Sequence, residues 1–465
     1  MITETPIKSH LVHEATKSLI VTGTVCAFFL GCETIDQIQN EFRDLTPHEM
    51  YQESLISAGL NGTALALEWL EASESALMQA PEVETPFQEE GFFSDASPQA
   101  RGYKISLRRG QQLSVSLVTE TELPLRMFVD IYRLQTNPDA SPFPVISTES
   151  TLQSIEYVSP RTALYVVRIQ PELLRNGRYR IQLTAEGSMA FPVKDRNTLA
   201  ILSSFGVERD GGRRQHHGVD IFAPRGTPVI SATPGYVSRV ENTPIGGKVV
   251  WVRDQGPNSI YYAHLDSQVV ASGAKVEPGT LLGFVGNTGN ARTTPPHLHF
   301  GVYRRGEGPV DPYYFLYSPP ALSSLPANET QVLGFMSRTT NSGIRLRTSP
   351  SQGSQILREM KKNTSFLILA TTGSWQRVLL PDDQVGFVAS RLTENASIPL
   401  RVTQIEYPVR LMSAPNPTAP MIELIGPGSG ISVLGNFNSY HYVQTQNGIL
   451  GWIANEQDLA MVEDR

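Results

Sequence analysis

The stretch Gln215-His-His-Gly-Val-Asp-Ile-Phe-Ala-Pro-Arg-Gly-Thr-Pro-Val229 carries the residues that decide the fold of this chain. Two related segments follow it, Tyr261-Tyr-Ala-His-Leu265 and Pro295-Pro-His-Leu-His-Phe-Gly301. Five of the nine histidines in the 465 residues fall between positions 216 and 299. Short apolar runs separated by turn residues connect the segments, so we expect a β-rich domain around the histidine cluster.

The alternation of side chains along a strand decides which of these residues can meet. His216 and Asp220 are four residues apart, so in an extended segment they point to the same face. Gly218 between them contributes no side chain that could block a metal ion. His297 and His299 share a face for the same reason. Two imidazoles and a carboxylate suit a catalytic zinc that keeps its fourth position for water.

The neighbours of these residues are expected to serve the fold. Leu298 and Phe300 alternate with the two histidines and should face the core, and His217 should be structural or face solvent. Tyr262 shares a face with His264 by the same alternation. It is therefore either a substrate contact or a tyrosine of the core or rim.

No single motif here is specific, because one buried histidine is more often a satisfied polar group than a ligand. The combination is specific, since the three motifs occur in this order within 85 residues. In this combination the sequence closely resembles the lysostaphin/LytM-type zinc peptidases, which cleave peptidoglycan peptides. The resemblance runs from about Asn197 to Tyr317 and includes Gly286-Asn-Thr-Gly-Asn290.

The resemblance implies a role for each residue of the cluster. His216, Asp220 and His299 match the Zn2+ ligands of the family, and His264 and His297 match its two catalytic histidines that do not bind metal. Zinc lowers the pKa of bound water toward about 7 and polarises the scissile carbonyl. One histidine would hold or deprotonate the water and the other would stabilise the oxyanion or protonate the leaving amine. Sequence leaves this division open.

The family often has Glu where Gly301 stands. This difference affects a contact near the site and removes no ligand.

The segments before this region predict two further units. Residues 32–94 are predicted to form a helical segment followed by a linker, with a helix start at Thr46-Pro-His-Glu49 that has the spacing of a capping box. Residues 95–192 alternate with period two and predict an antiparallel β-sandwich. The peptidase domain is expected at residues 193–320. Whether residues 33–90 block its site is left open by the sequence.

The last third of the chain contains a repeat with an offset of 65 residues. Ile344-Arg-Leu-Arg-Thr-Ser-Pro350 aligns with Val409-Arg-Leu-Met-Ser-Ala-Pro415, and Trp375 aligns with Tyr440. These segments resemble bacterial SH3-like domains, which attach enzymes to cell-wall peptides. We expect two such domains, at residues 330–395 and 396–465. Trp375 and Trp452 could equally be core residues of small barrels, and the second unit need not bind a ligand.

The N-terminus predicts export. Leu19–Gly31 is apolar and is too short to span a membrane, but it suits the core of a signal peptide. It ends in Phe29-Leu-Gly-Cys32, which resembles a lipobox, so residues 1–31 are a predicted leader and Cys32 a predicted lipid attachment site. The alternative is an uncleaved short anchor or a buried segment. Cys26 and Cys32 are the only cysteines of the chain, so a fold that is held together by several disulfide bonds is excluded.

Together these features predict a mainly β, multidomain protein of the cell envelope, on its periplasmic face. A formal net charge of -7 gives no attraction to a polyanion, so we expect no nucleic-acid partner. The expected activity is zinc-dependent hydrolysis of peptide cross-links in bacterial peptidoglycan, by a monomer that also uses wall peptides as its anchor.

Two rival functions remain. One is a non-catalytic wall-binding regulator that retains the peptidase fold, and the other is a zinc peptidase acting on proteins or bacteriocin-like peptides. The sequence does not indicate which bond of the wall peptide is cut or which membrane carries the anchor.

Overall fold

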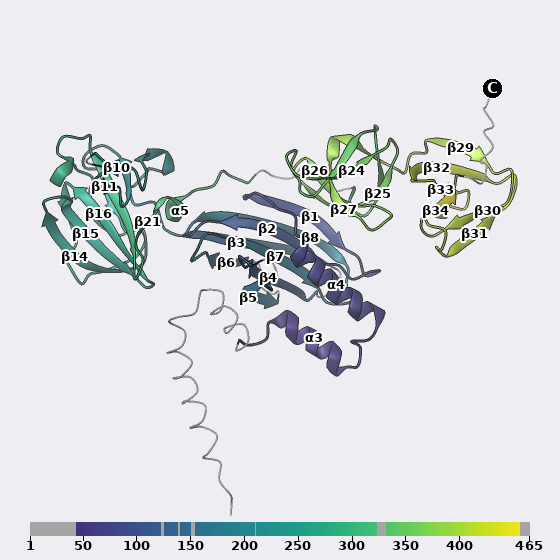
Figure 1. The fold of residues 1–465 in the computed structure, drawn as a ribbon, viewed down its shortest axis with the longest axis horizontal. Coiled ribbons are helices and arrows are strands. Elements are labelled where there is room, and N and C mark those ends of the chain that lie inside the picture. Colours follow the sequence, from purple (N-terminus) through teal and green to yellow (C-terminus); the bar gives the residue numbers. More distant parts are fainter. Residues whose placement is uncertain are drawn as a thin grey trace, which may run out of the picture.

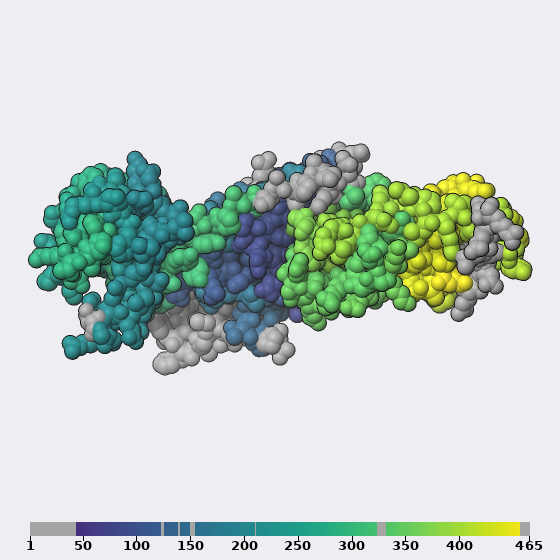
Figure 2. Space-filling view, turned by 90° about the horizontal axis from the view of Figure 1, so that it is seen from above, coloured from purple at the N-terminus to yellow at the C-terminus, as the bar shows by residue number. Residues whose placement is uncertain are grey.

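The computed structural model describes residues 43–121, 125–137, 140–149, 154–209, 211–322 and 332–455. The predicted leader and Cys32 lie outside the described residues. Within these ranges, no helix has both the length and the apolar character needed to cross a membrane. The predicted mainly β, multidomain fold is confirmed, with two helices ahead of the strands. Several β-rich bodies follow one another along an elongated molecule (Figures 1 and 2).

Two helices form a hairpin at the start of the described chain, α3 (Pro47–Ser57) and α4 (Ala64–Met78). The capping box begins α3 as predicted: the Thr46 side chain accepts from the Glu49 N–H, and the Glu49 carboxylate accepts from the Thr46 N–H at 2.8 Å. Trp69 of α4 is fully buried, and its ring stacks on His48 and contacts the edge of Phe128. The hairpin is therefore docked on the strands that follow it, away from residues 193–320, which were predicted to form the peptidase domain and are called the peptidase region below (Figure 1).

The following strands make a β-sandwich. They are β1 (Phe87–Phe93), β2 (Arg101–Leu107), β3 (Gln111–Glu120), β4 (Met127–Arg133), β5 (Phe143–Glu149), β6 (Ser154–Val158), β7 (Ala163–Pro171) and β8 (Gly177–Gly187). One sheet has the order β2-β7-β4-β5, and the helical hairpin covers its outer face. The facing strands β1-β8-β3-β6 belong to a larger sheet. Alternate residues of β3, such as Leu113 and Val115, point into the core between the two sheets.

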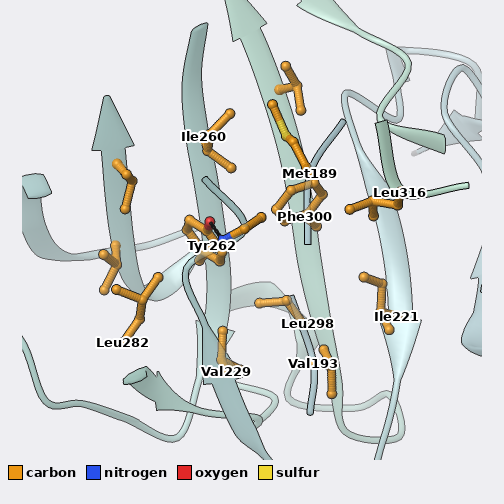
Figure 3. Close-up of a cluster of buried hydrophobic side chains, with 14 of the residues drawn as sticks. Met189, Val193, Ile221, Val229, Ile260, Tyr262, Leu282, Leu298, Phe300 and Leu316 are labelled. Carbon is orange, nitrogen blue, oxygen red and sulfur yellow. Dashed lines mark hydrogen bonds between the residues drawn. The ribbon is translucent and has the colours of Figure 1, made fainter. Parts of the chain in front are cut away.

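The predicted peptidase domain, residues 193–320, contains one large sheet, one small sheet and the separate two-stranded hairpin of β10 and β11. Its strands are β9 (Ile201–Ser203), β10 (Glu208–Arg209), β11 (Arg214–Gln215), β12 (Val219–Phe222), β13 (Pro228–Ile230), β14 (Gly235–Thr243), β15 (Gly247–Asp254), β16 (Asn258–Leu265), β17 (Ser267–Gln268), β18 (Lys275–Val276), β19 (Leu281–Phe284), β20 (His297–Arg304) and β21 (Gly308–Val310), followed by α5 (Tyr313–Leu316). The large sheet has the order β18-β14-β15-β16-β20-β12-β9, and β13-β19-β17 forms the small one. One face of the large sheet is buried in an apolar core that includes Ile221, Leu298 and Phe300 (Figure 3). The predicted site residues lie on the other face.

A packed joint connects the sandwich to the peptidase region. The ring of Phe315 in α5 lies against Gly110, where a Cβ atom would come within 2.5 Å of it. The Gly187 N–H donates to the Tyr317 carbonyl at 2.6 Å, and Arg109 pairs with Glu307 at 2.7 Å. The two bodies thus meet through backbone, apolar and ionic contacts.

The repeat at the C-terminal end forms two β-rich units with matching strand orders. The first contains β22 (Met336–Thr339), β23 (Ile344–Arg347), β24 (Ile356–Met360), β25 (Ser365–Thr372), β26 (Trp375–Leu379), β27 (Val385–Ala389) and β28 (Thr393–Asn395). The second contains β29 (Arg401–Gln404), β30 (Val409–Met412), β31 (Met421–Ile425), β32 (Gly430–Phe437), β33 (Tyr440–Thr445) and β34 (Leu450–Ala454). The order β24-β23-β27-β26-β25 recurs as β31-β30-β34-β33-β32. Trp452 is buried in a core, and Trp375 is half-buried.

The first unit of the repeat is fused to the sandwich. Strand β1 pairs with β25, so that one sheet of 11 strands runs through both bodies. Across this joint the fully buried Glu89 carboxylate accepts two hydrogen bonds from Arg377, at 2.9 and 3.0 Å. Its other oxygen accepts from the hydroxyls of Tyr103 and Tyr179. The alternating pattern of the sequence gave no sign of this connection.

Candidate metal centre

Three of the predicted site residues converge on the open face of the large sheet. Asp220 in β12 lies directly opposite His299 in β20, and His216 precedes β12 in the chain. The Asp220 Oδ1 atom is 3.0 Å from His216 Nε2 and 3.0 Å from His299 Nδ1. The two imidazole nitrogens are 2.9 Å apart. The donor atoms therefore form a nearly equilateral triangle.

This triangle fits a zinc ion. Tetrahedral zinc with bonds of about 2.0–2.1 Å holds its ligand atoms roughly 3.3 Å apart, close to the separations found here. The donor set of two imidazoles and one carboxylate is also a usual one for catalytic zinc. Among the described residues, these three form the group of His, Cys, Asp or Glu side chains whose ligand atoms lie close enough together, within 4.8 Å, to hold one metal ion.

Hydrogen bonds behind the triangle orient its members. His216 Nδ1 is 2.8 Å from the Ser204 carbonyl, which can only accept, so the proton sits on Nδ1 and Nε2 is left as a ligand. Asp220 Oδ2 accepts from Arg209 Nη2 at 2.7 Å, and the same nitrogen donates to Ser203 Oγ at 2.6 Å. Arg209 lies outside the sequence motifs and was not among the predicted site residues. The one sequence feature that could have indicated Arg209 is its position in a short strand-like segment just before His216.

Burial and hydrogen bonding shift the ionisation of the cluster. Burial would raise the pKa of Asp220, but hydrogen bonds with His216 and His299 hold that pKa well below its usual range. Burial lowers the pKa of His299. Both shifts favour the ionised carboxylate and the neutral imidazole, and these are the forms that bind a metal.

The other two predicted histidines lie beside the triangle. His297 Nε2 is 3.9 Å from Asp220 Oδ1, and its Nδ1 is 2.9 Å from the Pro295 carbonyl. His264 Nδ1 is 2.9 Å from the Thr288 carbonyl. Because carbonyl oxygens only accept, both rings carry hydrogen on Nδ1 and present Nε2 as a proton acceptor. Burial lowers the pKa of His264 to about 4, so that ring is neutral near pH 7.

The backbone at His264 overturns one expectation from alternation. Its φ of 63° is left-handed, and a register shift between Lys248 and Val250 interrupts the neighbouring ladder. Tyr262 lies on the core face with Ile260, and its hydroxyl accepts from the Ala232 N–H at 2.9 Å (Figure 3). The irregular backbone instead turns His264 toward the pocket. The prediction that Tyr262 shares a face with His264 is wrong, and the alternative that Tyr262 is a core tyrosine is confirmed. Tyr261 lies on the side of the site.

Tyr261 belongs to a group of half-buried aromatic side chains beside the triangle. Its ring centroid is 4.4 Å from that of Trp251 and 5.8 Å from that of His299. Tyr303 packs against Trp251 at 5.2 Å. Partly exposed aromatic groups at a cleft are typical of a binding surface.

Gly218 is needed for packing as well as for metal access. A Cβ atom there would lie 2.5 Å from the Phe300 carbonyl oxygen and 2.8 Å from the ring of His299. The residue thus allows the imidazole to lie against the backbone of the motif. His217 is exposed, as expected for a residue outside the cluster.

The cluster opens into a pocket of about 550 Å³. It is lined by Ser203, Arg209, Arg214, Gln215, His216, His217, Asp220, Phe222, Ile245, Gly246, Trp251, Tyr261, Ala263, His264, Asn290, Ala291, Thr294, His297, His299 and Tyr303. A neighbouring groove of about 620 Å³, lined by Leu199, Leu202 and Pro295 among others, shares Phe222 with it and contains none of the donors. The chemistry therefore belongs to the first pocket.

Two segments of the chain match models of known protein families. Residues 214–312 match the model of peptidase family M23, and residues 342–394 match that of a bacterial SH3 domain. The chain is 39% identical over 138 residues to the L-Ala--D-Glu endopeptidase of Bacillus subtilis (strain 168), covering 27% of this chain and 42% of that protein. It is 37% identical over 114 residues to the peptidoglycan DD-endopeptidase ShyA of Vibrio cholerae, covering 24% and 25% respectively.

Among solved structures, the catalytic domain of the antimicrobial peptidase lysostaphin from Staphylococcus simulans is 30% identical, with a TM-score of 0.23. That likeness covers 24% of this chain and 88% of that one. The chain spans less than half the length of each of the two curated relatives.

Proposed function

We propose, from the match of residues 214–312 to peptidase family M23, that this chain is a zinc-dependent endopeptidase acting on peptide cross-links of bacterial peptidoglycan. The observation that carries the proposal is the triangle of His216, Asp220 and His299 at the base of an open pocket. The two curated relatives are named as endopeptidases, one of them of peptidoglycan, which supports the same substrate.

His216, Asp220 and His299 would hold the zinc ion. When bound, zinc supplies an activated nucleophile near neutral pH and polarises the scissile carbonyl. The hydrogen bond from His216 to Ser204 and that from Arg209 to Asp220 orient the donor side chains before the metal binds. These side chains therefore lose little conformational freedom when zinc binds.

We assign the general base to His297, because its Nε2 lies 3.9 Å from the carboxylate of the triangle. Its Nδ1–H is held by the Pro295 carbonyl, so Nε2 accepts a proton from the attacking water. His264 carries Nδ1–H toward the Thr288 carbonyl, which also leaves its Nε2 as an acceptor. It therefore stabilises the oxyanion or donates to the leaving amine only after it has taken up a proton.

The accessory domains would set the location of this activity. We propose that the SH3-like units hold the chain on wall peptides, with export through the leader and a lipid on Cys32 keeping a monomer at the envelope. The domain boundaries 193–320, 330–395 and 396–465 form part of this proposal. The sandwich, expected at residues 95–192, begins earlier, because β1 (Phe87–Phe93) pairs with β8. Support comes from the match of residues 342–394 to a bacterial SH3 domain.

Purified chain, loaded with one equivalent of zinc and incubated with isolated cell walls, tests the proposal by release of muropeptides. His299→Ala should lose both zinc and activity. His297→Ala should keep zinc and lose about 10²–10⁴-fold in turnover. Lys275→Ala, an exposed residue of β18 in the same sheet that does not line the pocket, is the control and should match the wild type.

A zinc-bound chain that releases nothing would establish the regulator instead. Cleavage of protein substrates without wall hydrolysis would favour the other rival.

A further inference from the structure

A second cavity, the side groove, adjoins the catalytic pocket at Phe222. It has a volume of about 620 Å³, and its lining includes Leu199, Leu202 and Pro295. The Phe222 ring lines both cavities and stacks on the imidazole of His297, with the ring centroids 5.0 Å apart. The side groove therefore begins directly beside the proposed general base.

The same three neighbouring strands build both cavities. In β9, Ser203 lines the catalytic pocket and Leu202 lines the side groove. Next to it in the sheet, β12 ends at Phe222, and β20 begins at His297. Pro295 lines the side groove, while its carbonyl holds Nδ1 of His297 in the catalytic pocket. The two cavities are therefore parts of one cleft, with the donor triangle in one part and the side groove in the other.

The side groove is mainly apolar. Leu199 and Leu202 are 85% and 70% exposed, and they line the groove together with alanine, proline and phenylalanine residues. Asp195 and Arg196 also line it, and both are exposed to solvent. Large alkyl groups on the wall of a groove gain free energy when an apolar ligand removes them from water. A sugar chain suits this surface less well than the alkyl side chains of a peptide, because its hydroxyl groups would give up hydrogen bonds to water.

We propose that the side groove binds an apolar residue of the substrate peptide on one side of the scissile bond, so that peptides with an uncharged alkyl side chain at that position are preferred. This inference rests on the proposed function and narrows its substrate class. The volume of the groove, about 620 Å³, lies within the range of about 300–1,000 Å³ that is typical of ligand pockets. Binding energy gained away from the reacting bond helps to orient the peptide for attack. Leu199 and Leu202 are thus specificity-determining residues in this proposal.

The test uses a synthetic peptide that copies a cross-link of the wall, with both ends blocked so that shortening it adds no charge. Residues are removed one at a time from either end. At one step of this series, when the alkyl residue in the side groove is lost, the kcat/KM of the zinc-loaded full-length chain should fall about tenfold. Replacing that residue with serine should cost about as much. Leu202→Ser should bring the ratio of kcat/KM values across this step close to one, and Leu199→Ser should reduce it.

Leu281→Ser is the matched control, because it removes the same side chain from an exposed residue of β19 that lines neither cavity. It should keep the tenfold step. A wild-type chain with the same kcat/KM for every length of peptide would overturn the inference. So would Leu199→Ser and Leu202→Ser variants that both keep the full step, because the preference would then arise elsewhere in the cleft.

Calorimetry with the same peptides separates this inference from the proposed function. If the zinc-loaded wild type hydrolyses none of the peptides, the proposed function fails. A Kd that rises about tenfold at one step of the series, and does not rise there in Leu202→Ser, would still support binding in the side groove. Equal Kd values along the series would refute it.

Discussion

Replacing Gly218 with alanine tests whether the donor triangle depends on close packing. The new methyl group would lie 2.5 Å from the Phe300 carbonyl oxygen and 2.8 Å from the His299 ring, where ordinary contact begins at 3.4 Å. Something must move by roughly 0.6–0.9 Å. Phe300 is fully buried in the core, so the His299 imidazole yields and Nδ1 leaves the triangle.

Functional sites tolerate displacements of about 0.5 Å, so we expect a 10–100-fold loss of zinc affinity in Gly218→Ala. Competition with a chromogenic chelator on the full chain measures the affinity. Gly256→Ala is the control, because its added Cβ meets Asp254 at 3.6 Å or more and nothing closer. A folded Gly218→Ala protein that binds zinc within twofold of the wild type would refute the packing argument.

Three further perturbations address other parts of the molecule. Burial lowers the pKa of His48 to about 4 in the folded chain, against about 6.5 in the unfolded chain. The unfolded state therefore takes up a proton first, so the free energy of unfolding is highest above pH 6.5 and declines as the pH falls toward 4. The loss should reach about 2 kcal/mol by pH 5 in denaturant titrations followed by Trp fluorescence, and His48→Gln should abolish this component. Arg377→Met leaves Glu89 buried without its cation and should cost about 3–5 kcal/mol of unfolding free energy, so an unchanged denaturation midpoint would contradict the role of this pair. Arg209→Gln removes the charged donor to Asp220 and should weaken zinc binding about tenfold in the chelator assay, with a smaller deficit in Arg209→Lys.

The candidate site was largely predictable because its residues lie in short motifs on paired strands. The spacing of His216 and Asp220, and that of His297 and His299, maps onto one sheet face once β12 pairs with β20. Alternation failed at His264, because its φ of 63° turns its side chain toward the pocket while Tyr262 stays on the core face. A single backbone dihedral of this kind leaves no mark in the pattern of apolar residues.

Contacts between distant segments were beyond the reach of the sequence. Glu89 lies in what was expected to be helical and linker sequence, yet it is in β1 and pairs with an arginine 288 residues later. Arg209 was missed for a related reason: its role depends on the fold of a hairpin rather than on a motif. In the described part of residues 33–90, α3 and α4 pack on the sandwich rather than over the pocket that contains the donor triangle.

The fusion of the sandwich with the first SH3-like unit changes what anchoring can do. A flexible tether raises local substrate concentration in all directions, whereas a rigid connection acts only where its geometry allows both ends to engage. Here β1 continues into β25 and the buried Glu89–Arg377 pair crosses the joint, while Phe315 packs the peptidase region against the other end of the sandwich. The catalytic pocket and the SH3-like units consequently stand at opposite ends of one elongated body (Figure 1). Under the proposed function, an SH3-like unit bound to the wall would select cross-links at one fixed distance and orientation, because the connection through the sandwich leaves the pocket little freedom to reach others.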